Sequence, residues 1–341
     1  DAFGATGTGR LGDISITSAS SVTANADIIA GRFLRTTGTA GMAFAFNQPV
    51  DLDNGSAGNV FDLRNVSTLN LANGATVTTA NGGNVSFSGK STGALTIGTG
   101  AFNLNGTFNE TGFTGVTTGA NMTSASTINF NNAVTMTGDL TFAATTVSFV
   151  STLNGTTADT EGLAVTGNAT FGANIGTGVR LEFLTVSNAT SFAANVSTAN
   201  ALTLTGAVTL TGNATFNAGN VTFGSTVDSD GVAARSLTVN TSGAGTTSFG
   251  GAVGGMNRLA SVTTNADGQT NIGSSAFNLN GAATSDFGDN VLLIGNVLID
   301  QDGTGNVRFS GTVDSQDASN FSLTVNVASG TAIFAGDIGQ D

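Results

Sequence analysis

Long internal repeats limit the folds open to this chain more than any other feature of its sequence. The segment 202–227, LTLTGAVTLTGNATFNAGNVTFGSTV, aligns without a gap on the segment 128–153, INFNNAVTMTGDLTFAATTVSFVSTL, at an offset in residue number of 202 − 128 = 74, with close to half of the positions identical. The phrase VTFGSTVDS from Val221 returns as VRFSGTVDS from Val307, at an offset of 307 − 221 = 86. Such copies are typical of proteins that stack similar units. We therefore expect one continuous repeat structure over residues 1–341, with no separate catalytic domain.

Within each repeat, short apolar triplets recur every six to eight residues or so, as in Ile128 with Phe130 and Val134 with Met136. The apolar positions alternate with Thr, Ser or Asn, and this period of two is typical of strands with one buried face. Gly and Asn between the triplets supply the turns that short strands require. No segment shows the 3.6-residue period of a helix. The pattern predicts an all-β chain.

The even spacing of near-identical strands favours a parallel β-helix, or β-solenoid, over antiparallel sandwiches. With three strands per turn, a turn takes roughly 20 residues, so the chain would form about 17 turns. We expect each strand to stack on its copy in the next turn. Phenylalanines such as Phe142, Phe149, Phe216 and Phe223 should then pack on one another in the interior.

Composition and charge narrow the classes of function. The formal net charge is −13, and the nine basic residues are scattered along the sequence, which disfavours a nucleic-acid partner. No apolar run approaches the roughly 18 residues of a membrane span. Cys is absent, so disulfides and thiolate metal sites are excluded. We expect neither nucleic-acid binding nor a membrane span.

Paired aspartates beside glycine turns are the feature of the sequence that most resembles a binding or catalytic site. They are Asp300 and Asp302 in DQDG, Asp228 and Asp230 in DSDG, and the related pair Asp51 and Asp53 in DLDNG. Calcium takes six to eight oxygen ligands, and alternating carboxylates can supply several of them. The twelve-residue calcium loop and the GGxGxD repeat are both absent. Calcium at Asp300, Asp302, Asp228 and Asp230 is therefore one hypothesis, ordinary polar turns are the other, and we expect no other cofactor.

An enzymatic role is a remote alternative. A polysaccharide lyase or hydrolase on a β-helix would use paired carboxylates in a groove, and Asp228, Asp230 and Arg235 could form such a group. Sugar sites usually stack the rings on Trp or Tyr, however, and this sequence contains neither. Without His, Cys or Tyr, few groups remain for general acid–base catalysis. We expect no enzymatic activity.

A glycine-rich phrase that begins with Phe bears on self-association. It occurs as FGATGTGRLG from Phe3, FGANIGTGVRL from Phe171, FGGAVGGMNRL from Phe249 and FAGDIGQD from Phe334. The last copy stops at Asp341, before a residue corresponding to Arg10. If Phe334 to Asp341 and Phe3 to Arg10 supply two parts of one turn, head-to-tail contact between molecules would build a fibre. The alternative is that the missing parts belong to the same polypeptide.

The motifs FGGAVGG with RLASVTT, LTLTGAVTLTG and VTFGSTVDS resemble the β-strand-repeat proteins of bacterial surfaces. These include filamentous-haemagglutinin-like adhesins, autotransporter passengers and surface-layer β-repeat proteins. The resemblance covers nearly the whole chain, but its motifs specify a turn of the solenoid and not a biological function. It implies a right-handed parallel β-helix that is secreted or lies at the bacterial cell surface.

These observations lead to two hypotheses about function. The first is a non-enzymatic structural protein of the bacterial cell surface, assembling as an extracellular fibre, sheath or surface layer by head-to-tail or lateral self-association. The second is an adhesin passenger, or stalk, that presents a binding tip outside this chain, with host or cell-surface glycans as partners. Discrete monomeric rods would favour the stalk, and long polymers would favour the assembling subunit.

Overall fold

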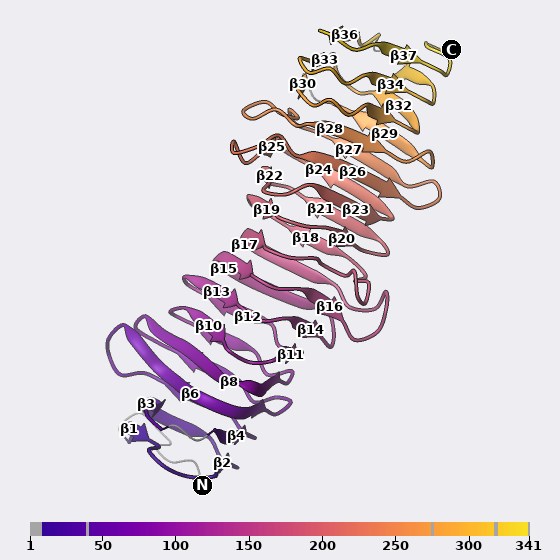
Figure 1. The fold of residues 1–341 in the computed structure, drawn as a ribbon. Helices are drawn as coiled ribbons and strands as arrows, with labels where there is room; N and C mark the ends of the chain where they lie inside the picture. Colours follow the sequence, from indigo (N-terminus) through magenta and orange to yellow (C-terminus); the bar gives the residue numbers. More distant parts are fainter. Residues whose placement is uncertain (1–8, 39–40, 274–275, 317–319, 340–341) are drawn as a thin grey trace. The chain divides into compact units, whose positions relative to one another are not determined.

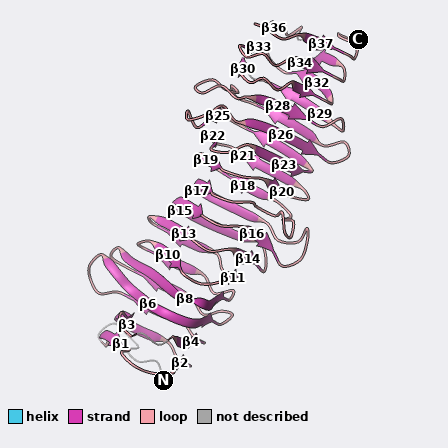
Figure 2. Ribbon diagram, in the orientation of Figure 1, coloured by secondary structure: helices cyan, strands magenta, loops and turns pink. Residues whose placement is uncertain are grey.

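The computed structural model describes residues 9–38, 41–273, 276–316 and 320–339. These residues form short strands joined by turns and loops, with no helix among them (Figure 1, Figure 2). The contacts divide the chain into two compact units, Asp1–Gly172 and Ala173–Asp341. In each unit, parallel strands stack as a β-solenoid, with about 14 turns in the chain. The predicted all-β parallel β-solenoid is confirmed, whereas its right-handedness and its continuity over residues 1–341 stay predictions.

Three parallel ladders run along the stack of unit 1, the first unit. Ladder 1 contains β1 (Leu11–Ser15), β3 (Ile28–Arg35), β6 (Gly58–Leu71), β8 (Gly83–Ile97), β10 (Phe108–Thr111), β13 (Thr127–Phe130), β15 (Leu140–Phe149) and β17 (Leu163–Phe171). Ladder 2 contains β2 (Ser21–Ala24), β4 (Met42–Phe46), β6, β8, β11 (Val116–Thr118), β14 (Val134–Met136) and β16 (Leu153–Gly155). Ladder 3 contains β3, β5 (Val50–Leu52), β7 (Val77–Thr79), β9 (Phe102–Leu104), β12 (Met122–Ser124), β15 and β17. The strands that occur in two ladders turn a corner of the solenoid.

Unit 2, the second unit, has the same plan. Ladder 4 contains β18 (Leu184–Val186), β21 (Ala201–Leu204), β24 (Asn220–Phe223), β27 (Thr246–Phe249), β29 (Gln269–Ile272), β32 (Asn290–Leu293) and β35 (Val313–Ser315). Ladder 5 contains β19 (Thr190–Phe192), β22 (Val208–Leu210), β25 (Val227–Ser229), the bridging residue Val253, β30 (Ala276–Leu279), β33 (Val297–Gln301) and β36 (Leu323–Val327). Ladder 6 contains β20 (Val196–Ser197), β23 (Ala214–Ala218), β26 (Ser236–Thr241), β28 (Ser261–Thr264), β31 (Ser285–Phe287), β34 (Val307–Phe309) and β37 (Ala332–Phe334).

The turns are longer on average than the sequence led us to expect. In ladder 4, Leu184 pairs with Leu202, a step in residue number of 202 − 184 = 18, and Val221 pairs with Thr247, a step of 247 − 221 = 26. The longer turn carries an extra loop over residues 230–235. The prediction of about 17 turns was therefore wrong: loops at the corners lengthen the turns, and the chain completes about 14.

The repeat copies do not stack on one another, contrary to expectation. Val221 lies in ladder 4, between Leu202 and Thr247, whereas its copy Val307 lies in ladder 6 and pairs with Ser285. The offset between the two copies is not a whole number of turns, so the later copy falls on a different face of the solenoid. The three faces accept the same sequence because each one needs only an alternating triplet followed by a corner.

Phenylalanine fills much of the interior. In unit 1, Phe130 is fully buried, and its ring centroid lies 5.1 Å from that of Phe108 and 5.4 Å from that of Phe149. The predicted contacts are confirmed within each unit: the centroids of Phe142 and Phe149, like those of Phe216 and Phe223, are 6.0 Å apart. Burial of a Phe side chain is worth about 1.5–3 kcal/mol, so this interior is a major source of stability.

Asparagine side chains at the corners link successive turns. Asn84 Oδ1 accepts a hydrogen bond from the backbone N–H of Thr107 (2.8 Å), and Asn220 Oδ1 accepts one from Thr246 (2.8 Å). Each bond satisfies a backbone donor at the start of a strand, just before β10 and at the first residue of β27. Hydrogen bonds from one turn to the next, accepted by asparagine side chains, explain why asparagine is common at the corners.

A carboxylate is buried inside unit 2. Asp289 is 2% exposed and accepts hydrogen bonds from the hydroxyl groups of Thr264 and Thr270, both 2.8 Å from Oδ1. Desolvation of the ionised form raises the pKa of the Asp289 carboxyl above its ordinary value of 3.8, although the two hydroxyl groups act in the opposite direction. The protonated carboxyl therefore favours the folded state more than the carboxylate does.

We predict that Asp289→Asn makes the stability of the chain less dependent on pH. A raised pKa in the folded state gives stability that is present at low pH and is lost as the pH rises through that value. The unfolding free energy of the parent chain should thus fall relative to that of Asp289→Asn above about pH 4, by at most about 1.4 kcal/mol per pH unit for one proton. Urea unfolding from pH 4 to pH 8 measures the difference, and parallel pH profiles would contradict the assignment.

Candidate functional site

The loop that follows β25 is held in place by hydrogen bonds to the carboxylate of Asp230, one of its own residues. Asp230 accepts hydrogen bonds from the backbone N–H groups of Val232 (3.1 Å) and Ala233 (3.2 Å). It also accepts one from Nη2 of Arg235, at 2.7 Å. The bond from Arg235, supported by the two backbone donors and opposed by desolvation, lowers the pKa of Asp230 to about 2. The carboxylate is therefore ionised at neutral pH and acts as a fixed acceptor within the loop.

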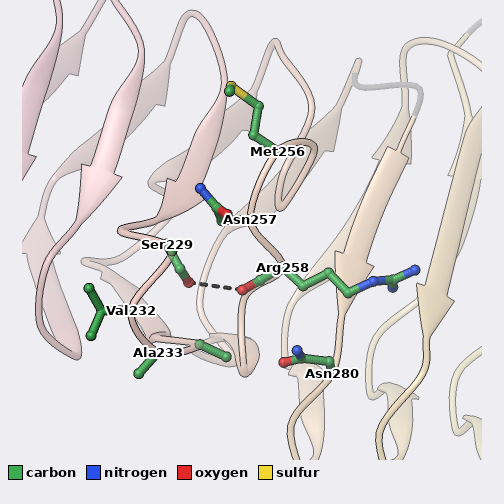
Figure 3. A pocket seen from close by; sticks show the side chains of 9 residues that line it. Ser229, Val232, Ala233, Met256, Asn257, Arg258 and Asn280 are labelled. Carbon is green, nitrogen blue, oxygen red and sulfur yellow. Dashed lines mark hydrogen bonds between the residues drawn. The ribbon is translucent and has the colours of Figure 1, made fainter.

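Two buried side chains at the end of β25 tie this loop to the corresponding loop one turn later, and Figure 3 shows one of them, Ser229, with its bond to Arg258. Asp228 Oδ1 accepts hydrogen bonds from the backbone N–H groups of Met256 (2.8 Å) and Asn257 (3.1 Å). The hydroxyl of Ser229 donates to the carbonyl oxygen of Arg258 (2.9 Å). Asp228 and Ser229 are 7% and 2% exposed, so these three bonds are shielded from water. The two loops are therefore held together as one body.

We call residues 229–235 together with residues 254–258 the double loop. It borders a cavity of about 390 Å³. The lining residues are Ser229, Gly231, Val232, Ala233, Ala234, Met256, Asn257, Arg258 and Asn280. Val232 and Met256 are 86% and 87% exposed. The double loop thus displays two apolar side chains to solvent from a backbone fixed by hydrogen bonds.

Arg258 spans two further turns of unit 2. Its Nη1 donates to the carbonyl oxygens of Leu279 (3.2 Å) and Asp300 (3.0 Å). Its Nη2 lies 2.6 Å from Oδ2 of Asp300 and 2.9 Å from Oδ2 of Asp302. One guanidinium therefore links three successive turns and pairs with both aspartates of DQDG, and the group of three side chains keeps a net charge of −1.

These contacts provide each of the four calcium candidates with a protein partner. Asp300 and Asp302 share Arg258, Asp230 binds Arg235, and Asp228 binds backbone N–H groups. Among the residues that the structure describes, no three His, Cys, Asp or Glu side chains are grouped closely enough to hold a metal ion. Calcium binding stays a prediction, and a bound cation would compete with these donors for the same oxygens.

The same arrangement occurs at Arg10 in unit 1. Nη1 of Arg10 donates to the carbonyl oxygens of Ala30 and Asp51, each at 2.9 Å, and Nη2 lies 3.0 Å from Oδ2 of Asp51. Arg10 was predicted as part of an assembly end, and the structure places its guanidinium on the next two turns of its own chain. Phe3 and Asp341, also predicted at the ends, lie outside the described residues.

The last described turn of unit 2 has an open edge. Phe334 and Ile338 are 40% and 58% exposed, and the three strands of this turn have fewer buried residues than earlier ones. An apolar groove of about 260 Å³ lies here. It is lined by Leu293, Val313, Asp314, Ser315, Phe321, Leu323, Phe334, Ile338 and Gly339. In the part of the chain that the structure describes, nothing covers this edge.

Two internal copies of the glycine-rich phrase, which lie on other ladders, show how a following turn packs on the same backbone conformation. Gly176, Gly254 and Gly339 each follow the Phe of their phrase by five residues and have φ of 63°, 67° and 67°. A Cβ at Gly176 or Gly254 would lie within 3.0 Å of the carbonyl oxygen of Ser197 or Asn278, in the next turn, whereas a Cβ at Gly339 would have nothing within 4 Å. The three glycines share a conformation, but only the internal two contact a following turn.

No family model, curated protein or solved structure matches this chain. The resemblance to surface β-strand-repeat proteins is therefore supported only at the level of a β-solenoid repeat fold. Within the described ranges there is no helix with the length and apolar character needed to cross a membrane.

Proposed function

We propose that this chain is a non-enzymatic structural protein of the bacterial cell surface, which builds an extracellular fibre, sheath or surface layer. The observation that carries the proposal is the edge of the last described turn, where the apolar side chains of Phe334 and Ile338 are about half exposed. Such an edge accepts a further parallel turn without a change of backbone. A second copy of the chain is the source of that turn in this proposal, and contact in one direction that does not close gives a polymer.

Three further features support a structural role. The fold repeats one simple element, the turn, and the side chains with catalytic potential at the double loop are used to hold loops together. The net charge of −13 keeps separate stacks soluble through mutual repulsion, which favours contact at the ends over random aggregation. Location outside the cell remains part of the proposal, consistent with a chain that has no Cys.

We predict that Gly339→Ala prevents end-to-end growth while the separate chain stays folded. The new methyl group would meet the carbonyl of an added turn, as it would at Gly176 and Gly254 inside the stack. In the isolated chain the residue has open space, so the substitution costs only the left-handed backbone conformation, about 1–2 kcal/mol. Light scattering and negative-stain images should show polymers for the parent chain and single particles for Gly339→Ala.

Gly243→Ala is the matched control. Gly243 also has a positive φ, of 60°, and open space around its Cβ position, but it lies in the loop between β26 and β27. This variant should polymerise like the parent. Equal polymerisation of both variants would rule out growth through the last turn, and a monomeric parent chain at all concentrations would favour the adhesin stalk instead.

A further inference from the structure

The arginine of the glycine-rich phrase borders a cavity in the three copies that contain it. Arg10 lines a cavity of about 540 Å³, Arg180 one of about 200 Å³, and Arg258 the 390 Å³ cavity of the double loop. In the copies at 176–180 and 254–258, the phrase leaves the regular strand pattern between its glycine and its arginine, so the chain bulges at a corner and leaves space beside it. A hollow that recurs with one sequence motif is a property of that motif and not an accident of one loop.

Two of these cavities also have carboxamide groups with unused hydrogen-bonding capacity. The side chains of Asn257 and Asn280, beside Arg258, make no hydrogen bond to a described residue. Beside Arg180, Asn217 and Asn240 bind each other through one bond of 2.8 Å, which leaves Nδ2 of Asn217 and Oδ1 of Asn240 for other partners. A planar amide offers a donor and an acceptor side by side, a match for neighbouring hydroxyl groups.

The charges around the cavities argue against an ionic ligand. Arg258 is neutralised by Asp300 and Asp302, so the double-loop cavity does not attract anions. The cavity beside Arg10 includes Asp13 and Asp53, of which Asp13 is paired with Arg32. The carboxylates beside both cavities are tied to arginine or to amide and backbone N–H donors, which disfavours a cation. A neutral ligand with many hydroxyl groups fits this lining best.

We propose that these cavities bind glycans, and that the double-loop cavity takes one neutral sugar residue. Asn257 and Asn280 would bond hydroxyl groups of the sugar, and Val232 and Met256 would flank it with apolar surface. The volume of 390 Å³ is within the usual range for small-ligand sites, about 300–1,000 Å³. No aromatic ring lines the cavity, so a single site is weak, and a polysaccharide that reaches several cavities gains affinity through multivalency.

Methionine methyl NMR provides a direct test of this site. The chain has four methionines, and Met42, Met122 and Met136 are at most 1% exposed whereas Met256 lies on the cavity. We would titrate chain labelled at the methionine methyl groups with methyl glycosides of a neutral hexose, an N-acetylhexosamine and a hexuronic acid. The signal of Met256 should shift and saturate with a neutral sugar, more weakly with the hexuronate, and the three buried methyl groups should report an unchanged fold.

The double variant Asn257→Ala with Asn280→Ala should bind the same sugar at least tenfold more weakly. Asn188→Ala is the matched control, because Asn188 is exposed and lines none of the cavities described here, and it should bind like the parent. The proposal is wrong if no sugar shifts Met256, if the double variant binds equally well, or if a short glycine-rich peptide shifts Met256 and sugars do not. The result is independent of polymerisation, so it can fail while the structural function stands.

Discussion

Phe130→Ala should lower the unfolding free energy of unit 1 by about 3–5 kcal/mol, because it removes a fully buried ring from the centre of three successive turns. The ring of Phe130 lies between those of Phe108 and Phe149, at 5.1 Å and 5.4 Å, and 5.7 Å from that of Phe142. The backbone around the resulting cavity is fixed by strand pairing on both sides, so collapse would fill it only in part.

Repeat structures can unfold in steps, so the measurement should resolve regions of the chain. Hydrogen exchange followed by mass spectrometry should show faster exchange in β10, β13 and β15 than in the parent. Phe334→Ala is the control, since Phe334 is 40% exposed and packs on Phe309 alone among the described rings. A loss for Phe130→Ala no larger than that for Phe334→Ala would mean that stacked rings do not stabilise this solenoid.

The sequence was sufficient to predict stacked parallel strands, because the alternation of apolar and polar residues determines where each short strand forms and which face it buries. Triplets such as Val134 to Met136 and Val208 to Leu210 alternate buried and outward positions in the structure, as the period of two requires. The strand on which each triplet stacks was not predictable from the sequence repeat. A partner depends on the length of the intervening turn, and that length changes with each corner loop: the turn after Leu184 is short, and the turn after Val221 is much longer.

The roles of the aspartates were not predictable for a related reason. Asp51 lies 41 residues after Arg10 and Asp300 lies 42 residues after Arg258, which is two turns in each case. That spacing is a usable signal once the length of a turn is known. When the length of a turn is unknown, DLDNG and DQDG look like self-contained loops, because the arginines that bind them lie about 40 residues earlier in the sequence.

Gly254→Ala should destabilise unit 2 by about 2–5 kcal/mol. The left-handed backbone accounts for about 1–2 kcal/mol. The rest comes from the new methyl group, which would displace the carbonyl of Asn278 and strain two ladder bonds: Val253 N–H to the Ala276 carbonyl (2.9 Å) and Asn278 N–H to the Val253 carbonyl (2.8 Å). Denaturant unfolding measures the loss, and hydrogen exchange in β30 should locate it.

Gly339→Ala separates the two contributions to that loss. Gly339 has the same φ of 67° as Gly254 but no following turn within reach, so its substitution should cost only the backbone term. The loss of unfolding free energy should be larger for Gly254→Ala than for Gly339→Ala. That difference, measured on unpolymerised chains, is the cost of forcing two stacked turns apart. If both variants lose the same stability, the close approach of turns at this glycine contributes nothing, and the argument that the same approach governs addition of a turn at Gly339 fails with it.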